Sequence, residues 1–243
     1  MIYRVKEGQV SYGEAIGIIL VENYAPYIPG DVANATTYNF PVRFQRVKSL
    51  KIDKLFKRSA ELTDDILKAG KSLVNEGVKA ITSDCGFLIF YQDTLANELS
   101  VPVFMSSLLQ LKFIINLIGM DDKIGIITSN SEALRKYVIN DFFNVAKDKI
   151  VIRGMENKEH FVSIFYEEKG ELDTTKFEEE VVSVAKEMVS NNPEVKIILC
   201  ECSAMAPYGP AIQNAVELPV FDYITMINYV HSATIKQRFN GFM

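Results

Sequence analysis

Short apolar runs alternate along the chain with longer stretches in which apolar side chains recur every third or fourth residue. Residues 15–21 form one such run, whose length is typical of a strand buried on both faces of a parallel sheet. Residues 59–76 instead carry a helical stripe made of Leu62, Ile66, Ala69 and Leu73. Gly77 follows at the position expected just past a helix end, so this segment predicts a helix that covers a sheet.

The same alternation continues to the end of the chain. Further strands are predicted at residues 42–47, 78–82, 102–104, 123–127, 149–152, 195–199 and 219–221. Further helices are predicted at residues 87–99, 107–119, 206–216 and 224–239, with two more within 157–191 and one that begins at Ser129 or Ser131. Strands that alternate with helices indicate an α/β fold in which helices cover parallel sheets.

Two of these strands end in the same kind of sequence. The strand at residues 78–82 leads into Asp84-Cys85-Gly86, and the strand at residues 195–199 leads into Glu201-Cys202-Ser203. The two cysteines lie about half the chain length apart, as two similar halves would place them. In open α/β sheets, ligands bind in the crevice at the carboxyl ends of the strands. Cys85 and Cys202 are therefore candidates for one shared site.

A thiol at the start of a helix is more acidic than a free thiol, because unpaired backbone N–H groups favour the thiolate. Two such thiols on opposite sides of a pocket suit the removal of a proton from one face of a carbon and its return to the other. A purely structural place in the core is the alternative for each cysteine. Cys200, one step deeper in its strand, is interpreted as a core residue, and strand alternation predicts that Asp84 and Glu201 face away from the thiols.

Composition and charge narrow the function classes. With 48% hydrophobic and 23% charged residues over 243 positions, the chain is globular and long enough for two α/β units. A net charge of −5 and the lack of a basic stripe disfavour nucleic acid as a partner. No apolar stretch reaches the roughly 20 residues that span a membrane, and no apolar signal core follows Met1. Three cysteines, an odd number, are typical of reduced thiols, so we expect a cytoplasmic protein.

Other site chemistries find weak support in the sequence. The three cysteines and the two histidines, His160 and His231, do not match the spacing of structural zinc sites. No serine lies in a Gly-x-Ser-x-Gly turn, and no glycine-rich phosphate loop follows a predicted strand. We therefore expect neither a metal nor a nucleotide cofactor.

At the two cysteine motifs the sequence resembles the aspartate/glutamate racemase superfamily, which includes hydantoin racemases. Residues 83–87, Ser-Asp-Cys-Gly-Phe, resemble its first cysteine motif, and residues 201–208, Glu-Cys-Ser-Ala-Met-Ala-Pro-Tyr, resemble its second. Residues 102–107, 125–129 and 219–222 lie where such proteins have comparable segments, so the resemblance covers nearly the whole chain. Glutamate racemases have Cys-Asn-Thr and Cys-Thr-His at the two motifs, so their substrate does not carry over to this branch.

The resemblance implies two similar Rossmann-like domains, each a parallel sheet flanked by helices, with the active site in the cleft between them. The first domain would comprise residues 1–105 plus 214–243, and the second residues 106–213. The implied enzyme is an isomerase, a cofactor-independent racemase or epimerase that needs no pyridoxal phosphate and acts at the Cα of a small amino acid or related carboxylate. Cys85 and Cys202 would be its two catalytic bases, one for each enantiomer. Many relatives in the superfamily are dimers, so a homodimer is an open expectation.

By position in this fold, seven further residues are predicted to bind the substrate: Asn34, Thr37, Gly86, Phe87, Thr128, Ser129 and Ser203. The first two are also suited to organising a turn, and Thr128 or Ser129 to capping a helix. Arg43 could pair a second substrate carboxylate, although its place within a strand favours a structural ion pair.

Three alternative functions stay open. Decarboxylation or isomerisation of a small dicarboxylate would use the same pocket. Non-catalytic binding of a small acid would tolerate the loss of either thiol. A redox-active thiol pair would form a disulfide between Cys85 and Cys202 on mild oxidation.

Overall fold

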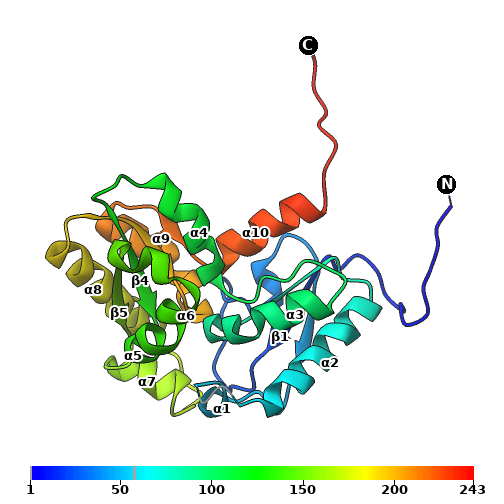
Figure 1. Cartoon of the computed structure of the whole chain (residues 1–243), viewed down its shortest axis with the longest axis horizontal. Coiled ribbons are helices and arrows are strands. Elements are labelled where there is room, and N and C mark those ends of the chain that lie inside the picture. Colours follow the sequence, from blue (N-terminus) through cyan, green and yellow to red (C-terminus); the bar gives the residue numbers. More distant parts are fainter. Residues whose placement is uncertain (1, 57–58) are drawn as a thin grey trace.

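Two parallel sheets with helices on their faces make up the computed structural model, which describes residues 2–56 and 59–243 (Figure 1). The first sheet has the strand order β2-β1-β3. Its strands are β1 (Ile16–Leu20), β2 (Val42–Arg46) and β3 (Ala80–Ser83). The second sheet has the order β5-β4-β6-β7. Its strands are β4 (Lys123–Thr128), β5 (Ile150–Gly154), β6 (Val195–Cys200) and β7 (Val220–Phe221). Neighbouring strands pair in parallel throughout, which confirms the predicted α/β class.

Helices connect the strands and cover both sheets (Figure 1). The α-helices are α1 (Ile52–Phe56), α2 (Glu61–Asn75), α3 (Gln92–Glu98), α4 (Leu111–Ile114), α5 (Ser131–Ala133), α6 (Asn140–Phe142), α7 (Glu159–Phe165), α8 (Thr174–Asn191), α9 (Gly209–Val216) and α10 (Tyr223–Thr234). Short 3-10 helices lie at Ala35–Thr37, Gly86–Tyr91, Ser107–Gln110, Ile115–Leu117, Asn144–Lys149 and Ser203–Tyr208, and a π-helix at Leu134–Ile139. None of the helices in the described part of the chain is long and apolar enough to cross a membrane.

The predicted stripe on α2 forms the buried face of that helix. Leu62, Ile66, Ala69 and Leu73 are all buried, and Leu73 packs directly over Gly17 in β1. A Cβ on Gly17 would lie 3.0 Å from a methyl group of Leu73, so the glycine lets helix and sheet approach closely. Fully burying a leucine or isoleucine contributes about 1.5–3 kcal/mol relative to exposure, so this stripe stabilises the first sheet strongly.

Several segments differ from the sequence prediction, and one of them is the closing helix, which was expected at residues 224–239 but ends at Thr234. The strand expected at residues 102–104 is reduced to a single bridge between Ile81 and Val103. The apolar helix expected at residues 107–119 ends at Leu117 and changes along its length from a 3-10 helix to α4 and back to a 3-10 helix. Within it, Leu109 packs against two separate core clusters. Helix α1 was not predicted, and it begins beside the buried Leu50.

The end of the chain connects the two sheets. Strand β7 pairs with β6 and so extends the second sheet. Helix α10 follows immediately, and its residues Tyr223, Met226 and Ile227 pack in one cluster with Ile16 and Ile18 of β1. The chain therefore returns from the second sheet to the first at α10, while the division into residues 1–105 plus 214–243 and 106–213 stays a prediction.

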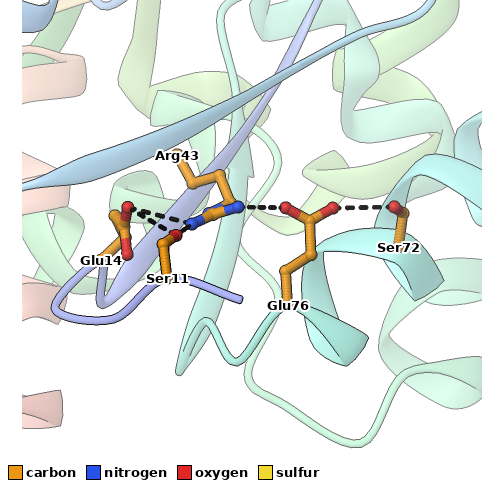
Figure 2. Close-up of polar contacts among 5 residues, drawn as sticks. All are labelled: Ser11, Glu14, Arg43, Ser72 and Glu76. Atoms are coloured by element: carbon orange, nitrogen blue, oxygen red, sulfur yellow. Dashed lines mark hydrogen bonds and ion pairs between the residues drawn. The ribbon is translucent and has the colours of Figure 1, made fainter. Parts of the chain in front are cut away.

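Arg43 is the centre of a polar network at the outer edge of the first sheet (Figure 2). From β2 its guanidinium contacts Glu14, 3.0 Å away, together with Ser11 and Glu76. Ser72 donates a hydrogen bond to Glu76 at 2.9 Å. The network ties the edge strand to the end of α2 and to the segment before β1, so Arg43 forms the structural ion pair that its place in a strand predicts.

Candidate active site between the two sheets

A small cavity of about 60 Å³ lies where the strands of both sheets end. Each of four strands leads into a residue that lines it: Val21 after β1, Cys85 after β3, Ser129 after β4 and Cys202 after β6. The structure thus brings together two cysteines that are far apart in the sequence. A larger surface hollow of about 980 Å³, beside α7 and α8, contains neither cysteine.

The rest of the cavity wall is mainly apolar and aromatic. It consists of Asn23, Tyr27, Ile52, Phe56, Asp84, Phe161, Phe165, Tyr166, Ser203 and Ala204. Among the residues that the structure describes, no lysine, arginine or histidine lines the cavity. Asp84 thus supplies a carboxyl group to a wall that also contains aromatic side chains and two thiols.

An outer pocket of about 480 Å³ shares five of these residues, Asn23, Ile52, Phe56, Phe165 and Tyr166. These shared residues line both spaces, and the boundary that they form is called the mouth of the cavity below. At this boundary the side-chain amide of Asn23 donates hydrogen bonds to the carbonyl of Phe165 at 3.1 Å and to the carboxylate of Glu168 at 2.8 Å. The first-strand loop and the end of α7 are thus joined at the mouth of the cavity.

Both candidate thiols are less acidic than a free cysteine. Burial raises the pKa of Cys85 and of Cys202 well above the ordinary value, and the nearby carboxyl of Glu201 raises both further. The backbone N–H groups of Phe87 and Leu88 lower the pKa of Cys85, and that of Ala204 lowers the pKa of Cys202, as a helix start predicts. The prediction of acidic thiols is nevertheless wrong for the unliganded protein, because burial outweighs the helix starts.

The acids that precede the two cysteines occupy equivalent places. The backbone N–H of Asp84 donates to the carbonyl of Ile19, and that of Glu201 donates to the carbonyl of Ile127. The side chain of Asp84 accepts a hydrogen bond from the N–H of Val21 at 3.0 Å, and that of Glu201 accepts one from the N–H of Ser129 at 3.3 Å. Each acid therefore binds the backbone just after an inner strand of its own sheet, β1 in the first sheet and β4 in the second.

The two acids differ in the surroundings of their carboxyl groups. Glu201 also accepts a hydrogen bond from the hydroxyl of Thr128 at 2.8 Å, and it lies against Gly86 of the first half. Asp84 lines the cavity, although strand alternation predicted that it faces away from the thiols. Burial raises the pKa of Asp84 to about 8 and that of Glu201 to about 7.

The structure distributes the predicted substrate-binding residues over three places. Ser129 and Ser203 line the cavity together with the cysteines. Gly86, Phe87 and Thr128 lie behind the wall: Phe87 packs edge-on against Phe56 with ring centroids 4.8 Å apart, and Thr128 is fully buried.

Asn34 and Thr37 lie in the turn after the first strand. Asn34 caps a 3-10 helix through the N–H of Thr36, and Thr37 donates to the carbonyl of Asp31 at 2.6 Å. Neither is among the residues that line the cavity, so the structure assigns them a part in the turn and their substrate contact stays a prediction.

Sequence reasoning missed most of the cavity wall. Val21, Asn23 and Tyr27 follow the first strand, and the strand-end rule that selected the cysteines could have found them. Phe161, Phe165 and Tyr166 come from α7 and the residue after it. Their helical spacing is that of any amphipathic helix, so no signal in the sequence separates them from core residues.

Within residues 2–56 and 59–243, no group of three or more histidine, cysteine, aspartate or glutamate side chains is arranged to hold a metal ion. Cys200 is fully buried in the core of the second sheet, as predicted. The described thiols are all free.

Comparisons with known proteins find relatives that are named as enzymes. The chain matches no family model. It is 31% identical over 226 residues to a dimethylsulfoniopropionate lyase of Durusdinium sp. clade D, a match that covers 88% of this chain and 73% of that protein. It is 30% identical over 226 residues to dimethylsulfoniopropionate lyase 3 of Emiliania huxleyi, of which it spans 58%. This chain is thus shorter than both relatives.

Solved structures of similar fold extend the comparison. An arylmalonate decarboxylase superposes with a TM-score of 0.60 at 11% identity, over 92% of this chain and 94% of that one. An aspartate racemase homologue from Pyrococcus horikoshii superposes with a TM-score of 0.56 at 18% identity, over 91% of this chain and 100% of that one. These likenesses confirm the predicted two-domain racemase-like fold. The chain belongs to the dimethylsulfoniopropionate lyase family and has the fold of the aspartate/glutamate racemase superfamily.

Proposed function

We propose that the chain is a carbon–sulfur lyase that cleaves dimethylsulfoniopropionate or a close β-sulfonio carboxylate, with a cavity thiol as the base. The observation that carries this proposal is the meeting of Cys85 and Cys202, from the two halves of the chain, in one small cavity. The relatedness to lyases named for this substrate supports the reaction class. The whole relatives are longer, so their activity comes to this chain as a proposal.

The reaction needs only a base placed at the carbon next to the carboxylate. A thiolate takes the proton from that carbon, and the electrons of the C–H bond become the carbon–carbon double bond. The bond between the β-carbon and sulfur breaks, and its electron pair leaves with sulfur as neutral dimethyl sulfide. Acrylate remains, and the thiol returns its proton to solvent. Because the leaving group departs neutral, the elimination needs no acid to protonate it.

A cationic substrate also answers the question of how the thiols ionise. Burial and the carboxyl of Glu201 keep Cys85 and Cys202 neutral in the free protein. A sulfonium cation in the same water-poor cavity lowers the pKa of a neighbouring thiol, because opposite charges attract strongly where the dielectric constant is low. A substrate with a cationic group would thus promote ionisation of the thiol that acts as its base, whereas a carboxylate without a cationic group would not.

The racemase or epimerase predicted from the sequence is a second candidate, favoured by one observation. An elimination requires a single base, whereas two thiols in one cavity suit removal and return of a proton at the Cα of a small amino acid. This isomerase would show itself by exchange of the Cα proton with deuterated solvent without any release of sulfide.

The experiment measures dimethyl sulfide in the headspace above purified protein supplied with dimethylsulfoniopropionate. Cys85→Ser and Cys202→Ser are compared with Cys200→Ala, which removes a thiol from the core instead of the cavity. We expect loss of the catalytic base to reduce kcat by about 100-fold or more in at least one cavity variant, while Cys200→Ala retains the activity of the folded fraction.

Proton NMR of an amino-acid panel in deuterated buffer runs in parallel. Sulfide release that survives both cavity substitutions would refute a thiol base. Cα exchange without sulfide release from the unaltered protein would instead establish the racemase.

A further inference from the structure

Asp84 is a buried acid at the cavity wall, and its carboxyl group accepts hydrogen bonds from backbone N–H groups. One oxygen accepts the N–H of Val21 at 3.0 Å, while the residue lines the cavity and is only 7% exposed. No described cationic side chain lines the cavity with it. A buried carboxylate is costly unless a positive charge or several hydrogen bonds compensate it. Burial accordingly raises the pKa of Asp84 to about 8.

Aromatic rings surround the same space. Phe56 of α1, Phe161 and Phe165 of α7, and the nearby Tyr27 and Tyr166 all line the cavity. The faces of such rings attract onium cations, and the attraction is stronger away from water. A carboxylate together with several aromatic rings is therefore chemically matched to a compact cation that carries methyl groups.

The equivalent acid of the other half provides a contrast. Glu201 is 1% exposed, and its carboxylate accepts from Thr128 and Ser129 and lies against Gly86. Both hydrogen bonds reach the same carboxylate oxygen, and Glu201 is not among the residues that line the cavity. The two halves thus differ at this position, since Asp84 is among the residues that line the cavity and Glu201 is not.

We propose that Asp84 is the specificity-determining residue, which selects an onium cation over an uncharged group of the same shape. This inference rests on the proposed function, because it concerns the cationic end of that substrate. Since Cys85 follows Asp84 directly, a cation held by Asp84 also lies on the side of the cavity where it favours the thiolate of Cys85.

A pair of unreactive ligands tests the charge alone. 3-(Trimethylammonio)propanoate and 4,4-dimethylpentanoate have the same carboxylate and nearly the same shape, but the first has a positive nitrogen where the second has carbon. Isothermal titration calorimetry gives the dissociation constant of each for the intact chain. We expect the unaltered protein to bind the cation at least about 10-fold more tightly, a difference of about 1.4 kcal/mol.

Asp84→Asn retains an acceptor for the N–H of Val21 and removes the group that ionises when a cation lies beside it. We expect this variant to lose the preference about 10-fold, through weaker binding of the cation. Asp31→Asn is the matched control, because Asp31 is also a buried acid with a hydrogen bond to one N–H, that of Ala33, but is not among the residues that line the cavity. Asp84→Ser is the second variant, used if Asp84→Asn does not fold.

The outcomes separate this inference from the proposed function. An unchanged preference in folded Asp84 variants would overturn the role of Asp84, and so would equal or tighter binding of the neutral ligand by the unaltered protein. Sulfide release by the unaltered protein is measured independently. If release is absent while an Asp84-dependent preference for the cation is found, cation selection stands and the lyase reaction falls.

Discussion

Gly86 leaves the space that the carboxylate of Glu201 occupies. Glu201 follows β6 of the second sheet, and Gly86 begins the 3-10 helix after β3 of the first, so the two halves of the protein meet at this contact. A Cβ on Gly86 would overlap the carboxylate. The missing side chain thus makes room for the carboxyl group of Glu201, which raises the pKa of both Cys85 and Cys202.

Gly86→Ala is expected to destabilise the fold by about 1–3 kcal/mol, because the new methyl group must displace a hydrogen-bonded buried carboxylate. Denaturant unfolding measures the free energy. Glu201→Ala removes the carboxylate that the new methyl group would meet. In that background Gly86→Ala should therefore cost less unfolding free energy than it costs in the unaltered protein. Gly209→Ala is the control, since its Cβ would come no closer than 3.2 Å to Asp222. Additive effects of the two changes at Gly86 and Glu201 would contradict the contact.

The stability of the protein should fall as the pH rises from about 5 to 8. Asp31, Asp84 and Glu201 have pKa values of about 7, 8 and 7, above the ordinary values near 4, because they are buried. Between the two sets of values the folded state binds more protons than the unfolded state. Each such group therefore contributes a loss of up to about 1.4 kcal/mol per pH unit.

Urea unfolding at several pH values measures this slope. Asp84→Asn should make it shallower, because the amide does not titrate. Glu194→Gln should leave it unchanged, since Lys123 holds the pKa of Glu194 below its usual value and that group titrates at lower pH. A stability that rises between pH 5 and 8 would show that the buried carboxyls are ionised without penalty.

Asn23→Ala removes the amide that joins the first-strand loop to the end of α7 at the cavity mouth. We expect a several-fold rise in KM with a smaller change in kcat, because a looser mouth holds the substrate less well and leaves the thiols in place. Hydrogen exchange should become faster in residues 159–170. Asn116→Ala, which loses one exposed bond to Lys112, is the control. Unchanged KM and exchange would mean that the contact does not close the cavity.

The alternation of apolar runs and helical stripes determined the fold class and most of the elements. Local sequence suffices there, because a strand covered on both faces and a helix covered on one impose their own periodicity. Sequence also selected the two cysteines, since the carboxyl ends of parallel strands meet at one edge. Arg43 could likewise be assigned to a structural network from its place in a strand, and Figure 2 shows the carboxylates that complete it.

Only the tertiary structure decided the chemistry of the cavity. The thiols are weakly acidic because of burial, which depends on how the two sheets pack and which no local pattern reports. Asp84 lines the cavity whereas the equivalent Glu201 does not, and Phe161 and Phe165 reach the wall from a helix distant in the sequence. The sequence by itself thus determined which strand ends meet, whereas long-range packing decided the charge, the depth and the aromatic lining of the site that they form.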